Sequence, residues 1–121
     1  MPPPLASAYL RLIQVVHRLE SQGPFQRLDA ETVRLLETIT VAHFEGQAMT
    51  VSGAMQLSRI ASPASIHRKL EQLRIASLIT HEFNEGNRRT KYLAPTVQSL
   101  KHYDQLSAEL IKIKLSPLES K

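Results

Sequence analysis

Residues 62–93, SPASIHRKLEQLRIASLITHEFNEGNRRTKYL, decide the fold. The opening Ser-Pro pair is a strong helix start, because serine caps a helix and proline fits its first position, where a backbone N–H would be unpaired. Apolar residues then recur at helical spacing and must face a core: Ile66, Leu70 and Leu73. The sequence therefore predicts a helix over residues 62–75.

Beyond this helix the pattern changes to that of strands. Residues 78–83 read as a strand, residues 84–87 carry turn chemistry, and residues 88–93 read as the returning strand. Pro95 ends the pair. The sequence predicts a β-hairpin whose tip is basic.

Upstream, a helix is predicted from about Asp29, a good cap residue, to about Phe44, with Gly46 ending it. Its apolar residues spread widely around the axis, as in a helix buried on more than one side. They are Val33, Leu35, Leu36, Ile39, Ala42 and Phe44.

Between these two helices, residues 51–57 read as a short helix capped by Thr50 or Ser52, and residues 58–61 form a turn. Helix, short helix, turn, helix and hairpin is the order of a winged helix-turn-helix. The expected fold class is mainly α, formally α+β, with the hairpin as the wing.

Residues 5–20 and 96–115 read as helices outside this core, and Gly23-Pro24 stops the first of them. Each helix has one apolar stripe. The stripes either fold back on their own domain or pack against a second copy in a two-fold dimer. The residues expected to hold the homodimer are Leu5, Tyr9, Leu12, Ile13, Val16, Leu100, Tyr103, Leu106, Leu110 and Ile113.

The composition is that of an ordinary globular domain. With 121 residues, 42% apolar and 21% charged, the chain is expected to form a single domain over residues 1–121 with its core over residues 28–95. The absence of cysteine excludes disulfides and thiolate metal sites. We expect no signal peptide and no membrane helix, since no run approaches the roughly 20 apolar residues required, and a cytoplasmic protein.

The positive charge is concentrated in one segment. Residues 59–91 carry seven basic and three acidic residues, which equals the net charge of +4 for the whole chain. A focused basic patch attracts a polyanion, although a basic face that is merely solvated is the alternative.

The helix over residues 62–75 is expected to enter the major groove, about 12 Å wide, with the wing over residues 84–91 on the backbone or in the minor groove. Arg68 suits guanine and Gln72 suits adenine, whereas Glu71 either accepts from cytosine or is repelled by phosphate. The expected DNA contacts are Ser62, Ala64, Ser65, His67, Arg68, Lys69, Gln72, Arg88, Arg89 and Lys91.

Little in the sequence points to catalysis. The five histidines do not match zinc-ligand spacings, and four glycines form no phosphate-binding loop. No serine sits in a nucleophile elbow. We therefore expect a protein that is not an enzyme and that uses no cofactor and no metal.

From about Leu28 to Thr96 the sequence resembles the MarR-type winged-helix regulators. The similar segments are residues 28–36 at the start of the core, Thr50-Val51-Ser52, residues 65–73 of the recognition helix and Asn87-Arg88-Arg89 of the wing. The resemblance implies a dimer held by the terminal helices, a basic reading position at Arg68 and an arginine, Arg89, that enters the minor groove.

The sequence departs from the family in the wing region. Asn87 stands where an aspartate is usual, Ser77 where a glycine follows the recognition helix, and Pro95 where an apolar residue is usual. The predicted function is sequence-specific binding of double-stranded DNA by a transcriptional regulator. A protein-interaction module without DNA binding and a regulator that senses an unidentified small molecule are the alternatives.

Overall fold

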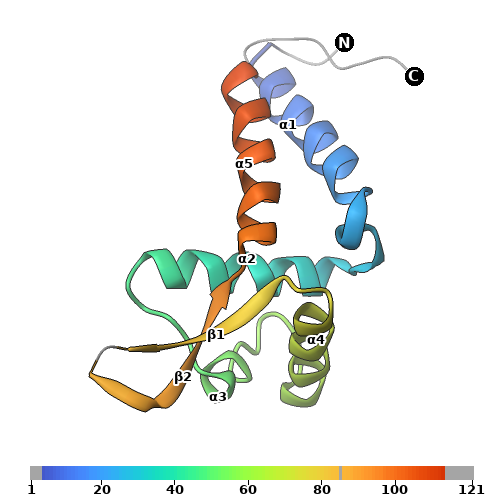
Figure 1. Ribbon diagram of the computed structural model, residues 1–121. Helices are drawn as coiled ribbons and strands as arrows, with labels where there is room; N and C mark the ends of the chain where they lie inside the picture. Colours follow the sequence, from blue (N-terminus) through green and yellow to red (C-terminus); the bar gives the residue numbers. More distant parts are fainter. Residues whose placement is uncertain (1–3, 85, 114–121) are drawn as a thin grey trace. The chain divides into compact units, whose positions relative to one another are not determined.

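The computed structural model describes residues 4–84 and 86–113 (Figure 1). The chain divides into two compact units, which are described in turn. One unit comprises residues 28–100, and the other comprises the residues up to Arg27 together with those from Lys101 onward. No helix in the described ranges combines the length and the apolar character needed to cross a membrane.

The unit of residues 28–100 is a winged helix-turn-helix, as predicted. Figure 1 shows its helices and hairpin, with α3, α4 and the hairpin on the same side of α2. The elements are α2 (Ala30–Phe44), α3 (Val51–Ala54), α4 (Pro63–Ile75), β1 (Ile79–Asn84) and β2 (Asn87–Pro95).

Each of these helices begins at a side-chain cap. The residue before α2, α3 and α4 accepts a hydrogen bond from the backbone N–H three residues on, at 2.8, 3.0 and 3.3 Å respectively, and these residues are Asp29, Thr50 and Ser62. The predicted starts are therefore confirmed. Helix α3 ends at Ala54, earlier than expected, because Gln56 and Leu57 bond to carbonyls three residues back and tighten the chain into a turn.

The core lies between α2, α4 and the hairpin. Side chains with less than 2% exposure come from all three, so the prediction that one face of α4 is apolar and buried is confirmed. Each such leucine or isoleucine stabilises the fold by roughly 1.5–3 kcal/mol. The largest are Leu35, Leu36, Ile39, Ile66, Leu73, Leu78 and Leu93.

One expected core residue of α2 is exposed. Phe44 is 65% accessible because, at 100° per residue, it lies on the opposite side of the helix from the fully buried Leu35. Val41, on the same outer face, is 56% exposed. The buried side of α2 is therefore narrower than the sequence pattern indicated.

The wing is an antiparallel hairpin. Its register runs from Ile79 opposite Pro95 to Phe83 opposite Lys91, and an irregularity at Asn84 precedes the tip. The returning strand is longer than predicted at both ends. Pro95 is the last residue of the strand and does not lie beyond it. Proline has no N–H to donate, and it is tolerated at the end of a strand.

Two backbone features anchor the hairpin to the helices. Leu93 N–H donates a 2.7 Å hydrogen bond to the carbonyl of Met49, just before α3. Between α4 and β1, Ser77 has a φ of 60°, the left-handed region that glycine favours. This conformation explains why glycine is usual at that position in the family that the sequence resembles.

The second unit contains α1 (Pro4–Glu20), the 3₁₀ helix η1 (Gly23–Arg27) and the later part of α5 (Val97–Lys112). The first helix matches the predicted 5–20. The last helix begins after Thr96 as expected and ends three residues short of residue 115, and residues 114–115 lie outside the described ranges.

One buried side chain and two contacts hold the helices of this unit together. Val15 of α1 is 1% exposed. The ring of Phe25 stacks on that of His102 with centroids 3.7 Å apart, and Arg18 Nη2 lies 2.8 Å from Glu109 Oε1. Helix η1 was not predicted: Gly23-Pro24 ends α1 as expected but also begins a short helix that buries Phe25.

Candidate nucleic-acid interface

The outward face of α4 carries polar and small side chains. Those at positions i, i+4 and i+8 lie on one side of the helix, away from the buried leucines, because four residues advance 400° around the axis. Ser65 is half-buried beside them. The exposed residues of this face include Ala64, His67, Arg68 and Gln72.

Ser62 is exposed at the start of α4, but its hydroxyl oxygen has a structural task. It accepts the N–H of Ser65 at 3.3 Å and so caps the helix. A serine that caps keeps its O–H proton free to donate. Ser62 therefore remains compatible with the expected DNA contact.

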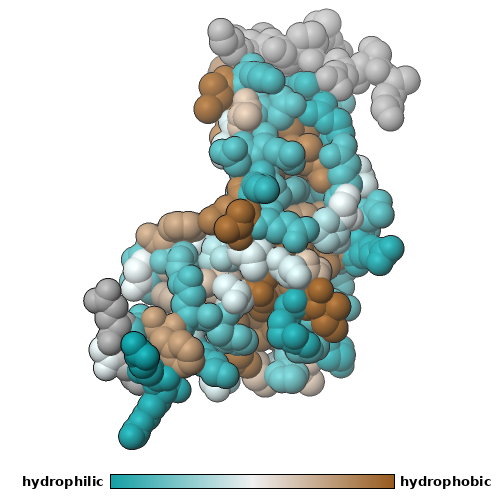
Figure 2. All heavy atoms as spheres, viewed as in Figure 1, coloured by the Kyte–Doolittle hydropathy of each residue, from teal (hydrophilic) through white to brown (hydrophobic). Residues whose placement is uncertain are grey.

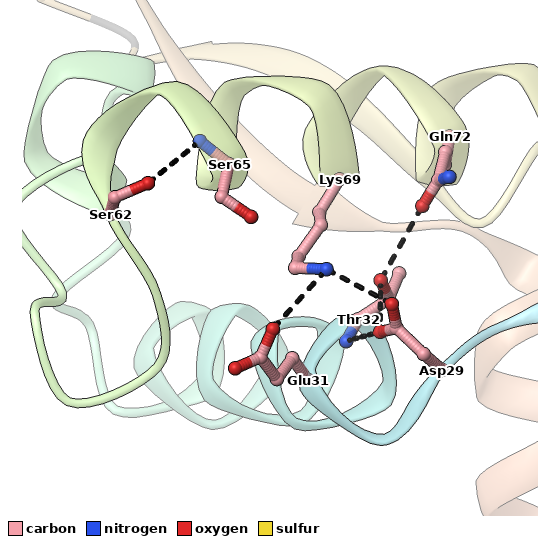
Figure 3. Close-up of polar contacts among 7 residues, drawn as sticks. All are labelled: Asp29, Glu31, Thr32, Ser62, Ser65, Lys69 and Gln72. Carbon is pink, nitrogen blue, oxygen red and sulfur yellow. Dashed lines mark hydrogen bonds and ion pairs between the residues drawn. The ribbon is translucent and has the colours of Figure 1, made fainter.

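Lys69 differs from its predicted role. Its side chain is only 10% exposed and points from α4 toward the start of α2 (Figure 3). Its Nζ lies 3.0 Å from Asp29 Oδ2 and 3.4 Å from Glu31 Oε1. The hydrogen bond with Asp29 raises the pKa of Lys69. The expectation that Lys69 contacts DNA is corrected accordingly, because position 69 lies on the inner side of the helix and its charge is already paired.

A second cation of α4 is paired on the surface. The guanidinium of Arg74 forms an ion pair and hydrogen bonds with the carboxylate of Glu71, one turn earlier. The hydrogen bond from Arg74 lowers the pKa of Glu71. Glu71 therefore offsets Arg74 on this face.

The wing places its cations near the tip. Arg88, Arg89 and Lys91 are all exposed on β2. In Figure 2 strongly hydrophilic side chains project from this end of the hairpin. Within residues 4–84 and 86–113, Arg88, Lys91 and Arg68 of α4 take part in no ion pair.

These pairings make the basic patch smaller than the sequence count indicated. Of the seven basic residues in 59–91, Lys69 and Arg74 are neutralised by carboxylates. The positive charge offered to a polyanion is thus concentrated on Arg59 before α4, on Arg68 and on the wing. No group of three His, Asp or Glu side chains within the described part of the chain is arranged to hold a metal ion.

Solved structures share this architecture. No family model matches the sequence, and no curated protein matches it. A mutant of MepR from Staphylococcus aureus, bound to an oligodeoxyribonucleotide, is 14% identical, with 87% of this chain and 69% of that chain covered at a TM-score of 0.57. FabT of Streptococcus pneumoniae in complex with DNA is 16% identical, with 86% and 70% covered and a TM-score of 0.54.

A MarR-like transcriptional regulator from Thermotoga maritima is 15% identical, with 86% of this chain and 75% of that chain covered and a TM-score of 0.57. The chain has a MarR-type winged-helix fold. At these identities the likeness concerns the MarR-type fold, and roles for individual residues follow from the geometry of this chain.

Four of the ten residues predicted to hold the dimer are exposed, and the other six are half-buried. On α1, Leu5 and Tyr9 are 83% and 64% exposed, whereas Val15 is buried. On α5, Leu110 is 52% exposed, and Ile111, which was not predicted, is 80% exposed. Leu100 is 36% exposed. The remaining stripe residues are half-buried, and they are Leu12, Ile13, Val16, Tyr103, Leu106 and Ile113.

Sequence reasoning missed the partners of Lys69. Asp29 was identified only as a cap, and Thr32 and Glu31 were given no role. The available signal was the cluster of Asp29, Glu31 and Thr32 at a helix start, which offers acceptors to any cation packed against it. The cation that binds this cluster is determined by the packing of α4 against α2. The spacing of residues within α4 does not predict that packing.

Proposed function

We propose that the protein is a transcriptional regulator that binds double-stranded DNA in a sequence-specific manner, with α4 in the major groove and the wing on the backbone or in the minor groove. Catalysis is not part of this proposal. In support, two proteins with the same fold, MepR and FabT, have been solved with DNA.

The observation that carries the proposal is the placement of the unpaired cations. Arg68 lies on the outward face of a helix whose other face is locked in the core, and Arg88 and Lys91 lie on the hairpin that follows it. An arginine on such a helix suits bidentate contact with guanine, and cations on a hairpin suit phosphates. Ala64, one turn before Arg68, leaves room for the bases.

Ser62, Ser65, His67 and Gln72 complete the proposed helix contacts, and Arg89 completes those of the wing. We place Arg89 in the minor groove, where a narrow groove attracts arginine. Lys69 is omitted for the reason given above.

The protein is proposed to act as a homodimer. Support comes from the exposed apolar residues of the terminal unit, because apolar surface is unfavourable in water and is often covered at an interface. These residues are Leu5, Tyr9, Leu110 and Ile111. A two-fold dimer presents two copies of α4 to two half-sites about one helical turn apart.

Selection of bound sequences from a random duplex pool tests the proposal. The expected result is an enriched motif with two-fold symmetry, which reflects two recognition helices in one dimer. The control is the same selection with Arg68→Ala, which is expected to lose the enrichment at one base pair of each half-site. If the duplexes bound at moderate salt have the same random sequences as the starting pool, the proposal is contradicted.

One observation favours a protein-interaction module instead. Ile75, at the end of α4, is 70% exposed close to the surface that is proposed to meet DNA. Substitution Ile75→Gln separates the two functions, because it leaves DNA affinity nearly unchanged if the helix reads bases. If the parent protein binds no DNA duplex, the protein-interaction module becomes the favoured function.

A further inference from the structure

Both carboxylate oxygens of Asp29 are used, and they connect two helices. Oδ1 accepts the backbone N–H and the hydroxyl of Thr32, each at 2.8 Å, and so caps α2 (Figure 3). Oδ2 accepts from the ammonium of Lys69, on α4, at 3.0 Å. One side chain therefore fixes both the first turn of α2 and the middle of α4.

The Lys69 ammonium and its two carboxylate partners differ in exposure. The Lys69 side chain is 10% exposed, whereas those of Asp29 and Glu31 are 60% and 56% exposed. An ammonium withdrawn from water needs a partner at short range, because an unpaired buried charge is strongly unfavourable. The pair is thus held at the boundary between core and solvent, where moving α4 would leave the ammonium without an acceptor.

Both members are charged at neutral pH. The hydrogen bond from the Thr32 backbone, followed by those from its hydroxyl and from Lys69, lowers the pKa of Asp29 to about 2. The Thr32 hydroxyl also lies 3.4 Å from Gln72 Oε1, one turn beyond Lys69. The single proton of this hydroxyl is donated to Asp29, so the 3.4 Å approach marks a second point where α4 lies close to the start of α2.

The direction of Lys69 determines the direction of its neighbour. Arg68 and Lys69 are consecutive and so project about 100° apart around the axis of α4. The apolar contacts of Ile66 and Leu73 are non-directional, which permits small rotations of the helix. A charge-assisted hydrogen bond is directional and removes that freedom.

We propose that Asp29 and Lys69 form a positioning pair that sets the rotation of α4 and thereby the discrimination between DNA sequences. Neither residue contacts DNA in this proposal. It rests on the proposed DNA-binding function, because a helix that reads base edges must hold its side chains in one orientation.

The variant Asp29→Ser/Glu31→Gln isolates the pair. Serine caps a helix about as well as aspartate, so the start of α2 is retained, but it offers no second oxygen to Lys69. The glutamine removes the other carboxylate partner. The matched control, Glu37→Gln/Glu45→Gln, removes two carboxylates from the same helix and its C-terminal cap at positions remote from Lys69.

Affinity is measured on a preferred and a scrambled duplex for the parent and both variants. The pair variant is expected to lose roughly tenfold in the ratio of the two affinities, the effect of misplacing one good base contact. The control is expected to keep the parent's ratio, although its affinity for both duplexes rises as negative charge is removed. A pair variant with the parent's ratio would overturn the proposal.

Amide hydrogen exchange in the free protein supplies the second measurement. Residues 66–73 of α4 are expected to exchange several-fold faster in the pair variant, while the Thr32 amide stays protected by the serine cap. Unchanged exchange in α4 would overturn the positioning pair. A parent that binds no duplex would instead refute the proposed function, and the exchange result would still decide the role of the pair.

Discussion

The hydroxyl of Thr96 donates a 2.7 Å hydrogen bond to the carbonyl oxygen of Ser77, the residue with left-handed backbone conformation between α4 and the wing. The same Thr96 oxygen accepts the N–H of Ser99 at 3.2 Å and caps α5. A single side chain thus connects the chain just after α4 to the start of α5, and it does so through a backbone atom of Ser77.

Ser77→Gly is therefore expected to stabilise the protein by about 0.5–1 kcal/mol. Glycine adopts a positive φ without the steric penalty of a Cβ, and the gain exceeds the entropy that its flexibility adds to the unfolded chain. The bond from Thr96 is retained because it uses the carbonyl. Urea unfolding measures the difference, and the exposed Ser58→Gly serves as the control, for which no stabilisation is expected. Lower stability of Ser77→Gly than of the parent would contradict this account.

Elements with their signals in local sequence were predictable. The starts of α2, α3 and α4 follow from Asp29, Thr50 and Ser62, because a cap is a contact over three residues. Helix η1 was not predictable in the same way. Its formation depends on the stacking of Phe25 on His102, two residues far apart in the sequence.

The stability of the terminal unit is expected to fall as the pH drops below about 6.5. Burial lowers the pKa of His102 from its ordinary value of 6.5, so the folded form prefers the neutral ring stacked on Phe25. As the pH falls through 6.5 the unfolded chain takes up the proton first, which favours unfolding. Thermal unfolding at pH 7.5 and pH 5.5 measures the loss.

The control for this titration is a comparison of two histidines. His102→Gln is expected to reduce the difference in thermal stability between the two pH values. Replacement of the exposed His17 with glutamine serves as the comparison. Equal pH dependence in both variants would show that another group is responsible.

Substituting Leu12→Asp together with Leu110→Asp is expected to convert a dimer into a monomer. Aspartate in an apolar interface is withdrawn from water without a partner, which is strongly unfavourable. Light scattering is expected to give a mass near twice 13.6 kDa for the parent and near 13.6 kDa for the variant. The paired control, His17→Asp with Gln105→Asp, alters exposed polar positions and is expected to stay dimeric. A monomeric parent at high concentration would contradict the dimer.

The candidate site was predictable in outline but not residue by residue. The pattern of α4 placed Arg68 outward, because the opposite stripe of Ile66, Leu70 and Leu73 is plainly apolar. It did not place Lys69, since a lysine at the edge of that stripe is equally suited to solvent and to a carboxylate on another helix. Only the packing of α4 against α2 brings Asp29 within 3.0 Å of it.

Arg88→Ala is expected to weaken binding to preferred and scrambled duplexes alike. A phosphate contact is independent of sequence, so its loss also lowers the salt dependence of binding by about one unit of slope per contact in each bound chain. Titrations at several salt concentrations measure both quantities. Arg27→Ala, an exposed arginine of η1 outside the wing, serves as the control. A selective loss on the preferred duplex alone would show that Arg88 reads a base instead.

The most direct test of the central claim, that α4 reads base edges, is titration of the parent and Arg68→Ala on the preferred and the scrambled duplex at several salt concentrations. The account predicts that the parent prefers the selected duplex, and that Arg68→Ala loses about 1–3 kcal/mol on that duplex while binding the scrambled duplex nearly as the parent does. Identical binding of the two proteins to both duplexes would contradict the assignment of α4 to the major groove.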